Sequence, residues 1–158
     1  MEFSIWLKIC NTHYLFFDGA SKSNPGMTGA GEIICNANGD IKSAYEWGLG
    51  PLSNNSVEAL ALYQGLIQLQ KLGISTATIL RDSAIIISLM VYNRNASNMI
   101  LQQTISHCQA LAQQMKEVRF FLVLRSLNKE ADSRARRACS KSIGNLCCNA
   151  IESQCYLP

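Results

Sequence analysis

The chain has 158 residues, 48% of them hydrophobic and 16% charged, and its formal net charge is +3 at pH 7. This length suits one domain with one hydrophobic core, and the composition excludes a disordered or fibrous chain. No apolar run approaches the roughly 18 residues of a membrane span, and residues 1–17 lack the pattern of a signal peptide. We therefore expect a soluble, monomeric domain that does not act on a membrane.

The first half of the sequence predicts three strands and a long helix. An apolar run at residues 13–17 ends in Asp18-Gly19, and residues 23–26 carry a concentrated turn signal. Further strands are expected at residues 29–35 and 41–47, with a turn between them. Apolar residues then recur at helical spacing until Gly73, which can end the helix. This order indicates an antiparallel meander followed by a helix.

The second half predicts alternating strands and helices. Strands are expected at residues 76–80 and 118–124, and helices at 83–92, 98–114 and 129–142. The fold class is therefore α/β: a five-stranded mixed sheet, three antiparallel strands then two parallel ones, flanked by helices. We expect one domain over residues 1–142 and a C-terminal tail over 143–158, for which the sequence shows no clear period.

The seven cysteines form no CxxC pair and have no companion histidines at zinc spacing. We therefore expect free thiols and a reducing intracellular compartment. Nothing in this pattern distinguishes the nucleus from the cytoplasm.

Positive charge is concentrated near the C-terminal end. Residues 116–141 carry eight Lys and Arg against three Asp and Glu. Such a segment could bind a polyanion, or it could be an ordinary solvated helix face on which Asp132 and Arg136 pair at i, i+4 spacing. The charge alone does not decide between these interpretations.

Four acidic residues stand at the ends of predicted elements: Asp18, Glu58, Asp82 and Asp132. Each has a structural explanation on its own, as a turn residue, as part of a capping box begun by Asn55, as a helix N-cap, and as half of a surface ion pair, respectively. This topology could also bring all four to one sheet edge, where clustered carboxylates need a cation. Hard divalent ions take oxygen ligands, and a pair of them stabilises both oxygens of a phosphodiester displacement. The four acids together therefore favour phosphoryl chemistry.

Four short motifs resemble those of the ribonuclease H family, particularly its plant reverse-transcriptase-like, retroelement branch. Residues 17–26 read FDGASKSNPG, with GAG at 29–31, and residues 53–60 read SNNSVEAL. The third motif is DS at 82–83 after a strand, and the fourth is RSLNKEAD at 125–132. All four occur in the family's order, and the resemblance covers roughly residues 12 to 140.

The resemblance implies a metal-dependent endoribonuclease that hydrolyses the RNA strand of RNA/DNA hybrids to 5′-phosphate and 3′-hydroxyl products. It makes Asp18, Glu58, Asp82 and Asp132 the catalytic ligands of two Mg²⁺ or Mn²⁺ ions. The family positions that contact the hybrid fall on Gly19, Asn24, Ser53, Asn54 and Asn55, although loop and helix-capping roles remain an alternative for the four polar residues. A fused or separate reverse-transcriptase or nucleic-acid-binding domain is a further expected partner.

The sequence departs from the family at three points. The loop before the final acid offers Arg125, Ser126 and Asn128 where bacterial-type members carry a histidine, and Arg81 precedes Asp82 where many relatives have a small residue. No basic protrusion that would grip the hybrid is visible between residues 82 and 128. These departures leave open an alternative: a catalytically silent nucleic-acid-binding or protein-interaction module on the same fold, a retroelement remnant.

Overall fold

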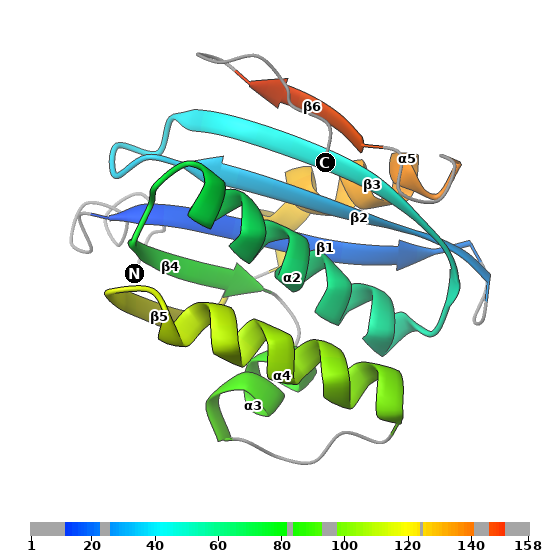
Figure 1. The fold of residues 1–158 in the computed structure, drawn as a ribbon. Coiled ribbons are helices and arrows are strands. Elements are labelled where there is room, and N and C mark those ends of the chain that lie inside the picture. Colours follow the sequence, from blue (N-terminus) through cyan, green and yellow to red (C-terminus); the bar gives the residue numbers. More distant parts are fainter. Residues whose placement is uncertain are drawn as a thin grey trace.

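The computed structural model describes residues 12–22, 26–81, 84–92, 98–123, 125–140 and 146–150. These residues form an α/β fold with a central sheet and helices on both of its faces (Figure 1). The strands are β1 (His13–Ser21), β2 (Gly26–Cys35), β3 (Ile41–Leu52), β4 (Thr76–Arg81), β5 (Glu117–Leu122) and β6 (Leu146–Ala150). The helical elements are α2 (Asn54–Lys71), α3 (Ala84–Tyr92), α4 (Met99–Gln113), the short 3₁₀ helix η1 (Arg125–Asn128) and α5 (Lys129–Ala138).

The sheet has the strand order β5-β4-β1-β2-β3-β6. Strands β1, β2 and β3 pair antiparallel, whereas β4 pairs parallel with both β1 and β5. This arrangement confirms the predicted five-stranded mixed sheet. A sixth strand, β6, adds antiparallel to β3 within residues 143–158, where the sequence showed no period.

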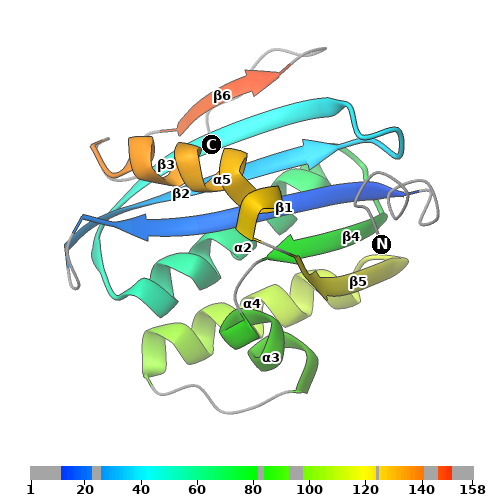
Figure 2. The same cartoon turned by 180° about the vertical axis from the view of Figure 1, so that it is seen from behind.

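The helices divide between the two faces of the sheet. Helices α2 and α4 lie over one face, and α5 lies over the other, as the view from behind shows (Figure 2). Strand β1 is buried on both sides: Leu15 and Phe17 belong to the core cluster beneath α2, whereas Tyr14 and Phe16 belong to a second cluster on the α5 side. Successive side chains of a strand point to opposite faces, so an apolar run such as residues 14–17 fits a central strand.

Helix α5 packs directly on the backbone of β2. A Cβ atom at Gly31 would lie 2.4 Å from the carbonyl oxygen of Ala131 and 2.6 Å from the nitrogen of Ala135, so only glycine fits this contact. The helix is also tied to β3, because Nη2 of Arg137 lies 2.8 Å from Oε1 of the buried Glu46. These contacts fix where α5 presents Asp132.

Helix α2 begins differently from the capping box considered above. Ser53 is its N-cap and accepts a hydrogen bond from the backbone N–H of Ser56, while Asn55 is already inside the helix. A capping box begun by Asn55 is therefore wrong, and Glu58 has no such capping role at this helix start.

Two further expectations concern thiols and membranes. The cysteines whose side chains the structure describes in detail, Cys35, Cys108 and Cys139, are buried and free. In the described part of the chain, no helix combines the length and apolar character needed to cross a bilayer.

Candidate active site

A polar pocket of about 660 Å³ opens where β4 ends, beside the second half of β1. Its lining comes from β1, α2, β4, η1 and α5, elements that are far apart in the sequence. The charged side chains among its lining residues are Asp18, Glu58, Asp132, Arg81, Arg125 and Arg136. Carboxylates and guanidinium groups thus share one concave surface.

The structure brings together most of the predicted site residues that it describes. Asp18 and Gly19 reach the pocket from β1, Asn54 and Glu58 from the first turns of α2, and Asp132 from α5. Three of the four predicted acids therefore meet in one place, as expected from their positions at element ends. Asp82 and Asn24 lie outside the described residues. Ser53 and Asn55 flank Asn54 at the start of α2 but do not line this pocket.

Gly19 explains how β1 and α2 come so close. A Cβ atom at Gly19 would lie 2.8 Å from the backbone nitrogen of Glu58 and 2.8 Å from the carbonyl carbon of Val57. The glycine therefore lets the start of α2 sit against β1, and this contact places Glu58 beside Asp18. Gly19 has a packing role in this fold, and its contact with a substrate stays a prediction.

Arg81 bridges two of the acids. Its Nη2 lies 2.8 Å from Oδ1 of Asp18 and also donates a hydrogen bond to Oε1 of Glu58. All three side chains are largely buried, with exposed fractions of 5% for Arg81, 6% for Asp18 and 15% for Glu58. The guanidinium also lies over the ring of Phe17, 6.0 Å from its centre. A buried guanidinium ion therefore neutralises part of the acid cluster.

Asp18 is the most perturbed acid of the pocket. Burial raises the pKa of Asp18 to about 7, against the lowering effect of the Arg81 guanidinium. A side-chain hydrogen bond with Asp132 and the negative charges of Asp132 and Glu58 raise this pKa further. Asp18 and Asp132 thus approach within hydrogen-bonding distance, which is how clustered carboxyl groups share a proton when no stronger cation separates them.

The acids fit a divalent metal in kind. Asp18, Glu58 and Asp132 offer carboxylate oxygens, the ligands that Mg²⁺ and Mn²⁺ prefer. Over the residues that the structure describes, however, no three His, Cys, Asp or Glu side chains converge closely enough to hold an ion. Arg81 lies between Asp18 and Glu58 instead, so the pair could hold a metal only with the guanidinium moved aside.

Sequence reasoning missed two residues that shape this pocket. It noted Arg81 as unusual but did not predict its ion pairs, although a lone arginine ending the apolar strand TATILR is a signal for a buried charge partner. It treated Asn128 as a loop residue, yet Asn128 is buried, and its side-chain amide donates a 3.0 Å hydrogen bond to the carbonyl oxygen of Phe17. Asn128 thereby joins the start of α5 to the residue before Asp18. The predicted pair of Asp132 and Arg136 is present, at 3.0 Å.

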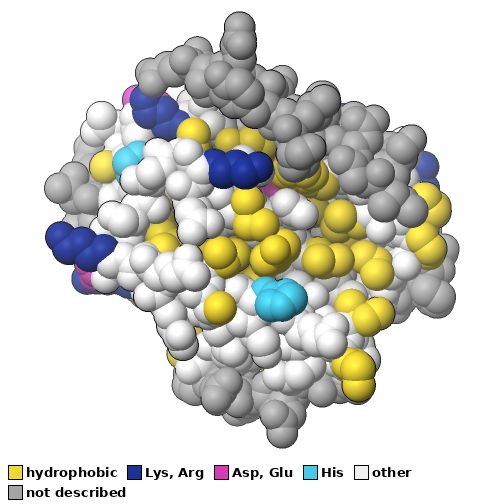
Figure 3. Space-filling view, in the orientation of Figure 1, with side chains coloured by type: hydrophobic (Ala, Val, Ile, Leu, Met, Phe, Trp, Pro, Cys, Tyr) yellow, Lys and Arg dark blue, Asp and Glu magenta, His cyan; other side chains and the backbone are white. Residues whose placement is uncertain are grey.

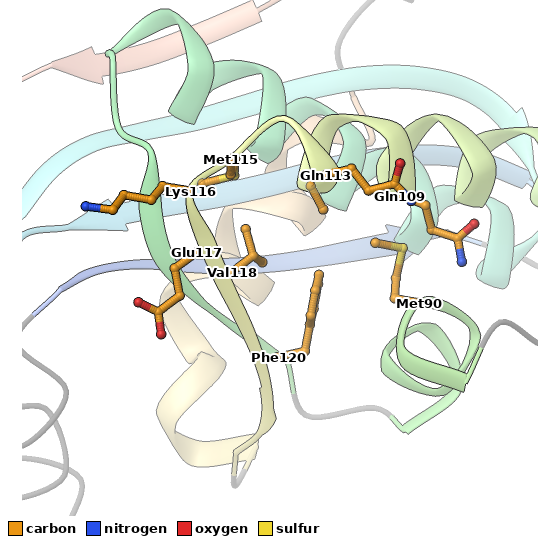
Figure 4. Close-up of a pocket in the computed structure, with 9 residues that line it drawn as sticks. Met90, Gln109, Gln113, Met115, Lys116, Glu117, Val118 and Phe120 are labelled. Atoms are coloured by element: carbon orange, nitrogen blue, oxygen red, sulfur yellow. The ribbon is translucent and has the colours of Figure 1, made fainter.

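A second pocket, of about 400 Å³, lies between α3, α4 and β5. Met90, Val118 and Phe120 line it, and the charged side chains of Lys116 and Glu117 point away from Met90 and Phe120 (Figure 4). The surrounding face, which carries α2 and α4, presents several hydrophobic side chains and few charged ones (Figure 3). We therefore place the candidate active site in the acid pocket and not here.

Comparison with known proteins agrees with this site. Residues 16–138 match the family described as reverse transcriptase-like. The chain belongs to this branch of the ribonuclease H family. The bifunctional protein Rv2228c of Mycobacterium tuberculosis is 30% identical over 122 residues, which are 77% of this chain and 34% of that protein. The Arabidopsis thaliana protein At1g65750, provisionally named a ribonuclease H protein, is 28% identical over 139 residues, 88% of this chain and 21% of the relative. This ribonuclease H family chain thus spans about a third or less of the length of these curated relatives.

Solved structures show the same fold. The N-terminal ribonuclease H domain of Rv2228c superposes with a TM-score of 0.77 at 29% identity, covering 81% of this chain and 93% of that one. The ribonuclease H1 of the archaeon Halobacterium salinarum also gives a TM-score of 0.77, at 24% identity, over 80% of this chain and 96% of its own. LC11-RNase H1 has been solved in complex with an RNA/DNA hybrid and superposes with a TM-score of 0.75 at 22% identity, over 81% and 96% of the two chains.

Proposed function

We propose that this chain is an endoribonuclease that hydrolyses the RNA strand of RNA/DNA hybrids to 5′-phosphate and 3′-hydroxyl products. The observation that carries the proposal is the meeting of Asp18, Glu58 and Asp132 in one polar pocket, although they come from three different elements. Membership of the ribonuclease H family supports it, and so does the fold shared with a protein solved on an RNA/DNA hybrid.

The proposed cofactor is a pair of Mg²⁺ or Mn²⁺ ions. Asp18, Glu58 and Asp132 would hold them together with Asp82. Bound there, the ions would supply the positive charge that activates a water molecule and stabilises the leaving oxygen of a phosphodiester. The oxygen-only donor set of the described acids supports this choice of hard cation.

The chain's own residues would bind and orient the hybrid. Arg125 and Arg136 line the same pocket as the acids, and both side chains are exposed, so they can reach backbone phosphates. Asn54 is exposed at the pocket wall, where its amide can contact a ribose 2′-hydroxyl, the group that distinguishes RNA from DNA. Ser53 and Asn55, beside it, and Gly19 and Asn24 complete the proposed contacts. Asn54→Ala should therefore reduce the preference for RNA/DNA hybrid over duplex DNA while the protein still folds.

The deciding experiment uses a hybrid with 5′-labelled RNA, incubated with the purified protein and Mg²⁺ or Mn²⁺. We expect internal cuts in the RNA strand, and no cuts with EDTA or with the variants Asp18→Asn and Asp82→Asn. Glu117→Gln is the matched control, because it makes the same change at a half-exposed acid away from the pocket, and it should cut like the wild type. Cuts that persist in Asp18→Asn would contradict the proposed site.

A second candidate function has one observation in its favour. Arg81 neutralises Asp18 and Glu58 without any metal, as a domain that binds nucleic acid but no longer cleaves it could also do. Such a silent module would bind the hybrid and leave the RNA strand intact with either metal, which the same experiment detects.

We further propose a reducing intracellular location and a partner domain that supplies affinity for the hybrid. The buried free thiols of Cys35, Cys108 and Cys139 support the first. The second is supported by the greater length of the relatives, one of which is named a bifunctional protein.

A further inference from the structure

Arg81 makes both of its ion pairs through one nitrogen atom. Nη2 contacts Oδ1 of Asp18 and Oε1 of Glu58 at the same time, and the guanidinium is almost fully enclosed. An enclosed charge of this kind is stable only with opposite charges against it, since water cannot solvate it. The geometry therefore makes Arg81 the cation around which these two acids are arranged.

The two oxygens that Arg81 contacts are donors that a metal bridging Asp18 and Glu58 would use. A divalent ion held by both carboxylates would lie between Oδ1 and Oε1, which is where Nη2 now lies. A guanidinium and a divalent cation cannot share that space, and their like charges repel. Arginine stays protonated throughout the physiological pH range, so deprotonation cannot relieve the conflict.

We infer that Arg81 is the resident counter-ion of the Asp18 and Glu58 pair, and that a divalent cation binds there only by displacing its guanidinium. The inference rests on the proposed function in that the acid cluster must bind such a cation. It adds that Arg81 sets how much metal the protein requires: the side chain stabilises the metal-free fold and weakens metal binding.

The test compares the wild type with Arg81→Met, which keeps the length of the side chain but removes its charge, and with Arg81→Lys, which keeps a charge. Arg119→Met is the matched control, because Arg119 pairs with Glu117 on the exposed part of β5. Affinity for Mn²⁺ is measured by calorimetry, and melting temperature is measured in EDTA and in saturating Mn²⁺.

We expect Arg81→Met to bind Mn²⁺ roughly tenfold more tightly or better, the scale on which a close charge acts on an acid. The same variant should melt below the wild type in EDTA and gain a larger increase on adding Mn²⁺. Arg81→Lys should fall between the two, and Arg119→Met should match the wild type. Equal or weaker Mn²⁺ binding by Arg81→Met would overturn the inference and leave the proposed function standing, whereas absence of Mn²⁺ binding in every variant would overturn both.

A measurement on the wild type covers the case in which Arg81→Met does not fold. With ¹⁵N-labelled arginine, the Nε–H signal of Arg81 should shift during a titration with Mg²⁺ while that of Arg119 stays in place. An Arg81 signal that is unchanged at saturating Mg²⁺ would show that the guanidinium keeps its ion pairs, and the inference would fall.

Discussion

The side-chain amide of Asn128 donates a hydrogen bond to the backbone carbonyl of Phe17, across 3.0 Å and 111 positions of sequence. Both residues are buried, and each stands next to an element that carries an acid: Phe17 precedes Asp18 on β1, and Asn128 precedes α5, which carries Asp132. This bond holds the two acids at a fixed separation. We expect Asn128→Ala to lower the free energy of unfolding by about 1–3 kcal/mol, because the Phe17 carbonyl loses its partner in a buried place.

Urea unfolding measures the stability of Asn128→Ala, and hybrid cleavage under conditions where the variant is folded measures its effect on the site. Cleavage should fall by more than the loss of folded protein accounts for. Asn38→Ala, at an exposed turn position, serves as the control and should change neither property. An Asn128→Ala variant that is as stable as the wild type would contradict the role given to this bond.

Gly31→Ala tests the contact between β2 and α5. The new methyl group would meet the α5 backbone at 2.4 Å, and a backbone atom cannot rotate away as the end of a side chain can. We expect a loss of roughly 1–3 kcal/mol or more in the free energy of unfolding. Because the helix must move to make room, Asp132 should move with it, and cleavage by the folded fraction should drop. Normal stability, measured by urea unfolding, would show that α5 does not pack this closely.

Glu32 predicts an unusual dependence of stability on pH. It lies fully buried on β2, and burial raises its pKa well above the ordinary value near 4.5, an effect that neighbouring Trp47 opposes only in part. A carboxyl whose folded-state pKa is raised stabilises the fold fully below its unfolded pKa, and this contribution is lost as pH rises toward the folded pKa. Glu32→Gln, which cannot ionise, should therefore be more stable than the wild type at neutral pH.

Urea unfolding of both proteins between pH 5 and pH 8 tests this sign. The advantage of Glu32→Gln should increase with pH, by up to about 1.4 kcal/mol per pH unit. Glu117→Gln, a change at a half-exposed acid, should show little change over the same range. An advantage that stays constant or shrinks with rising pH would contradict the raised pKa.

Arg125→Gln tests how the pocket meets the nucleic-acid backbone. If Arg125 neutralises one phosphate, its loss should weaken hybrid binding and reduce the slope of log affinity against log salt by about one. Arg119→Gln removes an equally exposed arginine outside the acid pocket and should leave the slope unchanged. Equal slopes for wild type and Arg125→Gln, measured by fluorescence anisotropy in metal-free buffer, would remove Arg125 from the proposed interface.

The sequence predicted those parts of the molecule that depend on local pattern. Apolar period and turn residues located the strands and helices of the five-stranded sheet, and the position of acids at element ends brought Asp18, Glu58 and Asp132 to one pocket. The partners of Arg81 and Asn128 could not be predicted in this way, because they depend on the parallel pairing of β4 with β1 and on the approach of α5 to β1. Strand β6 has only the five residues LCCNA, too few to show a period, and it forms only because β3 offers an edge.

That edge has a consequence for work with shortened forms of the protein. In the described part of the chain, β6 covers the outer side of β3, a strand of 12 residues. A chain ending at residue 142 would leave the backbone N–H and C=O groups along that side without their neighbour, and an open strand of this length is a template for pairing with another molecule. Truncation at the end of the last helix would thus retain every predicted catalytic residue and still produce a protein that self-associates through β3.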